Sequence, residues 1–397
     1  MNKKILAITL VMMLAVPAAY SQEWRIEPFL RVGYEIDDNA TLSFLTIAED
    51  EISGYIADVN VRFAYASETT EFFAAPRFVH RNYGDPEFDA DDQFFVFDWD
   101  RDTQFTNFRI RGNYGYEMVR TGERIDADLE IDDLDDIAID TSGLVAFRGR
   151  RERVEIRPEF AYRMSNVSAV RLEMRYVDVA YDESFMDLLN DYKDFRANLS
   201  YRRDWSNRST AVFGAMFGEY EADDREPVTG TGINGGIESR ISETTMFKAL
   251  VGIVNTELDT GESDVNWVAN LSLMRRLKTI TMLAQFRRVI AGGGGGSLTA
   301  RDFLNLNFTR RLSDRISAGI AVRAYTTTAL QEGAFTIDER DYLQVRWQFI
   351  WHLSRTFSMD FNYRYTILDR ELVGESANSN DVMVWLNWRP SAYSSAR

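Results

Sequence analysis

Arginine is the side chain in this sequence whose type and spacing suggest chemistry. It is by far the commoner basic residue, and many arginines stand at alternate positions in segments whose remaining positions are apolar. Alternate residues of a β-strand share one face, so these arginines are predicted to line one surface. Guanidinium groups bind carboxylate or phosphate through paired hydrogen bonds, which makes that surface a candidate anion path. The residues predicted to line it are Arg31, Arg62, Arg77, Arg109, Arg111, Arg157, Arg163, Arg171, Arg175, Arg196, Arg202, Arg323, Tyr342, Arg346 and Arg364.

A second interpretation of the same residues is structural. Carboxylates fall on the predicted arginine face as well, among them Asp58, Glu117, Glu155, Glu173 and Asp360. Ladders of arginine and carboxylate would fill and stiffen an interior that must be polar. The sequence leaves both interpretations open, and the preference for Arg over Lys favours the anion path.

Other kinds of chemistry find little support in the sequence. His80 and His352 are the only histidines and belong to distant hairpins, so no Ser-His-Asp set or metal-binding histidine cluster is expected. The chain has no Cys, which excludes disulfides and thiol chemistry. We therefore predict that the protein is not an enzyme and has no catalytic residue, metal site or cofactor. A net charge of −17 argues against binding to nucleic acid.

Two predicted loops are strongly acidic. Segment 121–143 carries nine carboxylates against one Arg, and segment 83–92 carries five. Such loops suit divalent cations that bridge surface lipopolysaccharide; a specific Ca²⁺ site is less expected, because neither loop has the Asp-x-Asp-x-Asp-Gly pattern. Segment 121–152 is an alternative candidate for a gate over the pore. The glycine run 292–296 is expected to be a flexible loop tip.

The fold prediction starts from residues 341–369. Apolar and polar residues alternate on both sides of the short turn 353–356, which is typical of an antiparallel hairpin. Each strand is long enough to cross a bilayer, since a tilted strand needs roughly 9–11 residues to do so. This hairpin is therefore predicted to span a membrane.

The same unit recurs along the whole chain. Eight short turns rich in Ser, Thr, Asp and Arg alternate with nine longer polar, acidic or glycine-rich segments. This predicts a closed, all-β, up-and-down antiparallel barrel of about 18 strands, with both termini on the periplasmic side. Residues 144–164 are predicted to form one tall strand rather than two.

Alternation also predicts which face meets lipid. In residues 24–36 the outward side chains are Trp24, Ile26, Pro28, Leu30, Val32, Tyr34 and Ile36. Tryptophans near predicted strand ends suit the interfacial girdles of an outer-membrane barrel. They are Trp99, Trp205, Trp267, Trp351 and Trp388.

The start of the chain predicts export. Residues 1–21 combine two lysines, an apolar stretch and the small-x-small sequence Ala19-Tyr20-Ser21, which is typical of a signal peptide. The barrel is predicted to occupy 22–390, followed by a short periplasmic tail at 391–397. We expect an integral protein of the bacterial outer membrane, in contact with its lipid and lipopolysaccharide.

The segment EPFLRVGYEIDDNATLS at 27–43, together with the turns RRDWSNRST and RRLSDRIS, resembles a family of outer-membrane β-barrel porins found in exopolysaccharide biosynthesis loci (β-barrel porin 2-like). In that family the first strand ends in a Tyr-x-x-Asp-Asn element, matched here by Tyr34, Asp37, Asp38 and Asn39. The chain also looks like the 18-stranded alginate exporter in strand number and arginine-rich lumen. The resemblance implies a conduit for a secreted polysaccharide that works with periplasmic polysaccharide-export proteins. Because arginines are predicted to line this conduit, the polysaccharide is expected to be anionic.

Three functions remain open at this stage. The first is export of an exopolysaccharide through the arginine-rich lumen. The second is uptake of small anionic or sugar solutes. The third is a structural or adhesive barrel with a closed lumen, in which the acidic loops would do the binding.

Overall fold

The structure is a computed structural model that describes residues 23–43, 51–119, 149–182, 189–223, 225–258, 263–294, 298–330, 340–370 and 375–396. The predicted signal peptide, the acidic segment 121–143 and Gly295–Gly296 lie outside these residues. Within the described ranges, the chain contains no helix that is both long and apolar enough to cross a membrane.

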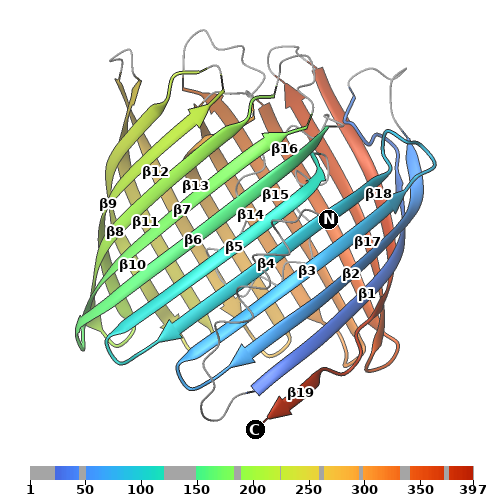
Figure 1. Ribbon diagram of the computed structural model, residues 1–397, viewed down its shortest axis with the longest axis horizontal. Helices are drawn as coiled ribbons and strands as arrows, with labels where there is room; N and C mark the ends of the chain where they lie inside the picture. The colour runs from blue at the N-terminus through green and yellow to red at the C-terminus, as the bar shows by residue number, and fades with distance from the viewer. Residues whose placement is uncertain are drawn as a thin grey trace.

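Eighteen long antiparallel strands close into a barrel, as the alternation predicts (Figure 1). They are β1 (Glu23–Asp37), β2 (Ile52–Ala66), β3 (Thr70–Asn82), β4 (Ala90–Asp102), β5 (Thr106–Met118), β6 (Arg150–Ser165), β7 (Ser168–Tyr181), β8 (Tyr192–Ser206), β9 (Ser209–Ala222), β10 (Val228–Ser242), β11 (Thr245–Leu258), β12 (Ser263–Arg276), β13 (Ile280–Gly292), β14 (Leu298–Arg311), β15 (Ile316–Ala329), β16 (Arg340–His352), β17 (Phe357–Arg370) and β18 (Glu375–Trp388). The eight short turns all lie at one end of the barrel, and the longer connections lie at the other (Figure 1).

The first and last strands close the ring. β18 pairs with Leu30–Asp37 of β1. The lower part of β1 pairs instead with a short strand, β19 (Tyr393–Ala396), which lies in the predicted periplasmic tail. The tail therefore covers the part of the β1 edge that β18 leaves free.

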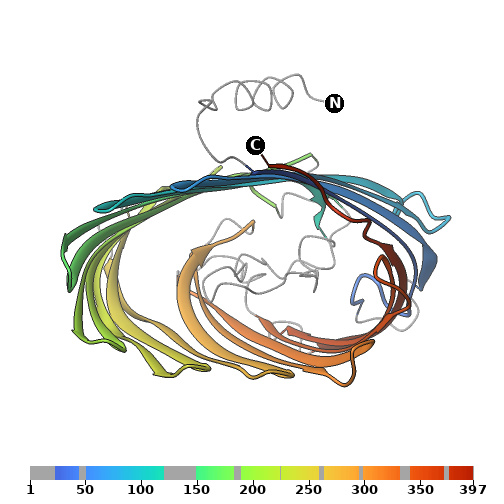
Figure 2. The ribbon, with the colours of Figure 1, turned by 90° about the horizontal axis from the view of Figure 1, so that it is seen from below.

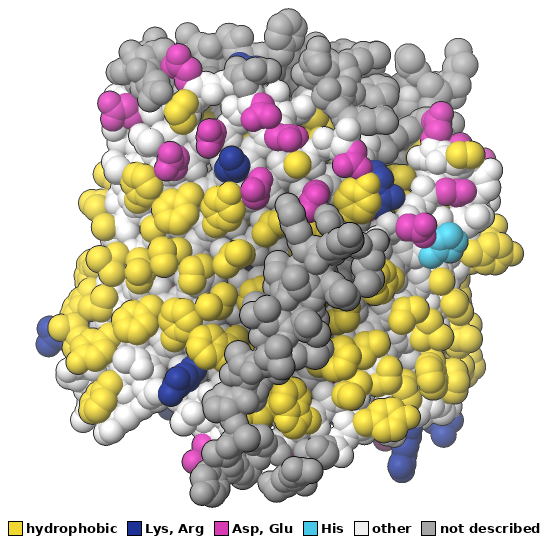
Figure 3. All heavy atoms as spheres, viewed as in Figure 1, with side chains coloured by type: hydrophobic (Ala, Val, Ile, Leu, Met, Phe, Trp, Pro, Cys, Tyr) yellow, Lys and Arg dark blue, Asp and Glu magenta, His cyan; other side chains and the backbone are white. Residues whose placement is uncertain are grey.

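The outer face carries an apolar belt. Large apolar side chains are exposed at alternate positions, such as Trp24, Ile26, Val32, Tyr34 and Ile36 on β1. In Figure 3 they form a band across the visible face, with Asp and Glu gathered above it toward the long connections. Exposed apolar rows of this extent are stable only against lipid, so the barrel is an integral protein of the bacterial outer membrane.

The interior has two unlike halves. On the inner face of β12–β18, apolar side chains form a packed cluster that also includes Leu42 from the connection after β1; its members are Leu42, Met274, Leu283, Phe303, Tyr325, Tyr342, Leu368 and Ala377. On the inner face of β5–β12, a cavity of about 440 Å³ remains. Seen from the short-turn end, the ring turns inward where β12 gives way to β13 and β14 (Figure 2).

Candidate functional site

Four of the predicted arginines form one row across the cavity wall. The register sets Arg111 of β5 opposite Arg157 of β6, and Arg175 of β7 opposite Arg196 of β8. β6 and β7 run in a register that also puts Arg157 opposite Arg175. Neighbouring strands lie about 4.8 Å apart, so the row extends about 14 Å across four strands. We call these four residues the arginine row.

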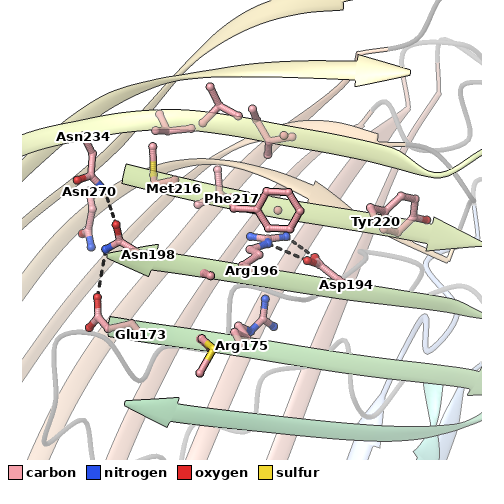
Figure 4. Close-up of a pocket in the computed structure, with 18 of the residues that line it drawn as sticks. Glu173, Arg175, Asp194, Arg196, Asn198, Met216, Phe217, Tyr220, Asn234 and Asn270 are labelled. Carbon is pink, nitrogen blue, oxygen red and sulfur yellow. Dashed lines mark hydrogen bonds and ion pairs between the residues drawn. The ribbon is translucent and has the colours of Figure 1, made fainter. Parts of the chain in front are cut away.

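Carboxylates beside the row hold its guanidinium groups in place. Arg175 Nε donates to Glu155 at 2.8 Å, and Arg157 donates to the same carboxylate. Arg196 Nε donates to Asp194 at 2.9 Å, as Figure 4 shows, and Arg111 pairs with Glu159. These bonds orient the arginines and neutralise part of their charge.

Like charges directly opposite one another on neighbouring strands destabilise a sheet. A row of four arginines therefore opposes folding locally, even with three carboxylates (Glu155, Glu159 and Asp194) bound to it. Arg287 of β13 lines the same cavity and adds a further positive charge. An arrangement that costs stability and concentrates positive charge on a cavity is typical of an anion-binding surface.

Glycines leave open space beside the row. In the same hydrogen-bonded line, Arg196 is followed by Gly218 of β9 and Gly230 of β10. A Cβ atom at Gly218 would have its nearest neighbour, the carbonyl oxygen of Phe195, at 3.6 Å, which is an ordinary contact distance, whereas one at Gly230 would meet a methyl carbon of Val254 at 3.3 Å. Both glycines line the cavity, so no side chain fills it at these two positions beside the row.

A polar strip continues from the row toward the short-turn end of the barrel. Asn198 Nδ2 donates to Glu173 at 3.2 Å, and Asn234 Nδ2 donates to Asn198 at 3.3 Å (Figure 4). Lys248 and Asn270 also line the cavity. The site thus offers amide and ammonium groups as further hydrogen-bond donors along the same wall.

Apolar side chains line the opposite, upper part of the cavity. Val228, Val254, Val268, Ile290 and Leu298 all face it. The cavity is thus amphipathic: the arginine row stands on one wall, and branched aliphatic groups stand on the other, beside Arg287 and Arg288.

The predicted arginines of β1–β5 lie on the inner face in ion pairs. Arg31 and Arg77 share the buried carboxylate of Asp58, with N–O distances of 2.7 and 2.8 Å. The guanidinium of Arg31 also lies 4.2 Å from the ring centre of Trp385. Arg109 Nε donates to Asp98 at 3.0 Å.

Near the short-turn end the predicted arginines are more exposed. Arg62 lies 3.8 Å from Glu27, and Arg163 pairs with Asp102 at 3.0 Å while donating to backbone carbonyls of the β4–β5 turn. Arg171 pairs with Glu159 at 2.6 Å. Arg202 Nη1 donates to Glu238 at 3.2 Å. Arg163 in particular ties the end of β6 to the β4–β5 turn, which favours the structural interpretation for this residue.

The remaining predicted residues lie in the packed half. Arg323, Arg346 and Arg364 are each 8% exposed, and Arg346 stands directly opposite Arg364 in the register. Tyr342 stacks on Tyr325 with ring centres 4.7 Å apart. These side chains point inward as expected, but the structure does not bring them to the cavity of the arginine row.

Sequence reasoning missed several inward-facing groups. Arg287 lines the cavity, and Arg301 and Arg340 are buried in the packed half. Trp385 also points inward, against Arg31. The alternation of β13, β14, β16 and β18 would have predicted that these side chains point inward, had it been extended to the strand ends.

The glycine run at the end of β13 is not a free loop tip over its described part. Gly293 and Gly294 are buried, and the carbonyl of Gly293 accepts a hydrogen bond of 2.8 Å from Tyr220 Oη. The carbonyl of Gly294 accepts one of 2.7 Å from the backbone N–H of Asn190. The prediction of flexibility was wrong here because these residues enter the barrel instead of projecting into water.

Three buried carboxylates approach each other near the top of β1. Glu35, Asp37 and Asp381 each offer an oxygen atom, and these atoms lie within 4.8 Å of one another. Tyr83 Oη donates to Glu35 at 2.5 Å, Ser379 Oγ donates to Asp37 at 2.7 Å, and Arg364 lies 3.4 Å from Asp381. Hydrogen bonds and one cation thus offset part of this negative charge.

Comparison with solved structures supports the fold alone. The barrel is similar to OccAB4 from Acinetobacter baumannii, with a TM-score of 0.50 and 8% identity, covering 94% of this chain and 99% of that one. It is also similar to the outer membrane protein opdK from Pseudomonas aeruginosa, with a TM-score of 0.49 and 8% identity, covering 93% and 99%. No family model matches the chain, and no curated protein sequence matches it.

Proposed function

We propose that this porin-type barrel is an outer-membrane channel for anionic solutes. The arginine row facing an open cavity carries this proposal. The row crosses four tilted strands, so it climbs along the barrel wall instead of forming a level ring. An anion can then move from one guanidinium to the next through exchangeable hydrogen bonds.

The bonded carboxylates suit passage better than tight capture. Each arginine of the row keeps one side engaged with Glu155, Glu159 or Asp194. The solute therefore meets partly neutralised cations, and its binding free energy at each step stays small. A path of several weak sites lets a solute both enter and leave.

The test is the reversal potential of the refolded protein in a planar bilayer under a salt gradient. Removing one cation changes an anion's energy in the cavity by about 1 kcal/mol at an intermediate dielectric constant, so Arg175→Gln and Arg196→Gln should each lower the anion-to-cation permeability ratio about fivefold. The matched control is Arg203→Gln, which removes an exposed charge on the outward side of β8. A cation-preferring wild-type pore, or equal effects of all three variants, would contradict the proposal.

Export of an exopolysaccharide is the second candidate, and one observation favours it. Arg–carboxylate pairs occur along the whole inner wall of β1–β8, from Arg81 with Asp92 near the long connections to Arg62 with Glu27 near the short turns. A polymer would contact many such groups at once. An acidic polysaccharide added on the short-turn side should then block the current at lower concentration than its free monosaccharide. Equal block by both would favour the small-solute channel.

A further inference from the structure

The seam between β12 and β13 is paired over only part of its length. Backbone pairing joins Ala269–Arg276 to Thr281–Arg288 and goes no higher. The neighbouring seams are paired almost to the ends of their strands, both from β11 to β12 and from β13 to β14. Ser263–Val268 of β12 and the upper end of β13 therefore have no partner across this seam.

The upper ends of β13 and β14 turn into the barrel instead. Tyr220, which holds the carbonyl of Gly293, belongs to β9, a strand separated from β13 by three others. Leu298 belongs to one apolar cluster with Val177 and Val179 of β7, and Ile290 packs against that cluster. Figure 2 shows this inward turn of the sheet.

The face of the hairpin that turns inward is its lipid face. Lower on β14, Leu304 and Leu306 are exposed on the outside of the barrel at 38% and 39%. Leu298 has the same parity but is 7% exposed, because it packs on the opposite inner wall. The row of side chains that meets lipid lower on β14 thus continues, at Leu298, into the lining of the cavity.

The side chains at the seam suit an interface between lipid and water. Trp267 on β12 is 50% exposed and points outward. The guanidinium of Arg288 lies 4.4 Å from its ring centre, pairs with Asp302 at 2.7 Å and also lines the cavity. Aromatic and cationic side chains are the usual residues at the level of the lipid headgroups.

We propose that this seam is a lateral portal through which a long-chain carboxylate passes between the outer leaflet and the cavity. The apolar chain of such a molecule would pack against Ile290, Leu298, Val254 and Val268. Its carboxylate would bind to the guanidinium groups of the arginine row. The long-connection end of a bacterial barrel faces the outside, so the portal opens toward the outer leaflet. This inference rests on the proposed anion path only in one respect, namely the binding of the carboxylate end by the arginine row.

The chain has no natural Cys, so a single introduced thiol reports on the seam. Ile290→Cys in lipid vesicles should react with a membrane-dissolved alkyl maleimide faster than with a sulfonated, water-soluble maleimide. Decanoate at about ten times its half-protecting concentration should slow this labelling about tenfold by mass action. Decyltrimethylammonium, which has the same tail and the opposite charge, should not protect the thiol.

Controls separate the portal from general access through lipid. Ile233→Cys lies on the outer face of β10, whose pairing with both neighbours is complete at that level, and is 61% exposed; it should react with the alkyl maleimide and gain no protection from decanoate. Val268→Cys, on the unpaired edge of β12, repeats the measurement should Ile290→Cys fail to fold.

The outcomes distinguish the portal from the anion path. Labelling at 290 by the sulfonated reagent alone, or equal protection by decanoate and decyltrimethylammonium, would overturn the portal. If the reversal potential nevertheless shows the expected dependence on Arg175 and Arg196, the anion path stands without the portal. Protection by decanoate in a pore without anion preference would leave the portal and reject the anion path.

Discussion

The two halves of the barrel interior use the same inward arginines in different surroundings. In the half formed by β5–β12, the arginine row faces a cavity of about 440 Å³ bordered by Gly218 and Gly230. In the half formed by β13–β18, Arg323, Arg346 and Arg364 are buried beside an apolar cluster. Alternation alone brings an arginine to the inner face, and the size of its inward neighbours decides whether it faces open space.

The connection after β1 helps to pack the second half. Asp38 accepts hydrogen bonds of 2.7 Å from both the backbone N–H and the side chain of Asn380, and Asn39 Nδ2 donates to the carbonyl of Asn378 at 3.0 Å. These bonds fasten the connection to β18. Leu42, with a positive φ of 50°, then reaches the apolar cluster and is 1% exposed.

The largest predicted effect tests whether the packed half behaves as a protein core. Phe303, on the inner face of β14, is 1% exposed and belongs to the apolar cluster. Phe303→Ala should lower the free energy of unfolding by about 3–5 kcal/mol, because it leaves a cavity that rigid strands cannot close. Urea unfolding of the protein in lipid vesicles, followed by tryptophan fluorescence, measures the change.

The control for this substitution lies on the lipid face of the open half. Phe213 on β9 is 62% exposed, so lipid chains can fill the space that Phe213→Ala leaves. Its loss of stability should be clearly smaller than that of Phe303→Ala. Equal losses would mean that the interior of β13–β18 is not packed.

A pair of glycine substitutions sharpens the comparison at a smaller scale. A Cβ at Gly292 would lie 1.8 Å from a ring carbon of Tyr220, so Gly292→Ala must displace the ring and should cost about 1–3 kcal/mol. Gly218→Ala should change stability by no more than about 0.5 kcal/mol, because a Cβ there meets its neighbours at ordinary distances. The same unfolding assay compares them, and a larger loss at Gly218 would show that the open half is packed.

The outer face and the topology could be predicted from the sequence, because lipid enforces strict alternation. Trp24, Ile26 and Val32 must face hydrocarbon, and the short turns fix the order of the strands. The inner face obeys no such rule. Phe303 and Leu368 occupy inward positions that are expected to be polar, and their burial depends on contacts between strands far apart in the sequence.

The arginine row shows the same limit within the site. Alternation identifies Arg111, Arg157, Arg175 and Arg196 as inward, yet their alignment depends on the register of three seams. A shift of two residues in one seam would keep every arginine inward and break the row. The inward turn of β13 could not be predicted from the sequence either, because it depends on a contact with Tyr220, which lies four strands away.

The smallest predicted effect concerns the contact that joins the two halves across the lumen. Tyr220→Phe removes the hydrogen bond to the carbonyl of Gly293 and keeps the ring, so stability should fall by about 1 kcal/mol. Tyr176→Phe is the control, because its hydroxyl bonds to Asp178 at 3.2 Å on the outward face of β7, where water can replace it. If the inward turn of β13 is maintained by this bond, Tyr220→Phe also raises single-channel current fluctuations while Tyr176→Phe does not. If neither variant raises the single-channel current fluctuations, apolar packing alone holds the β13–β14 hairpin against β7–β9.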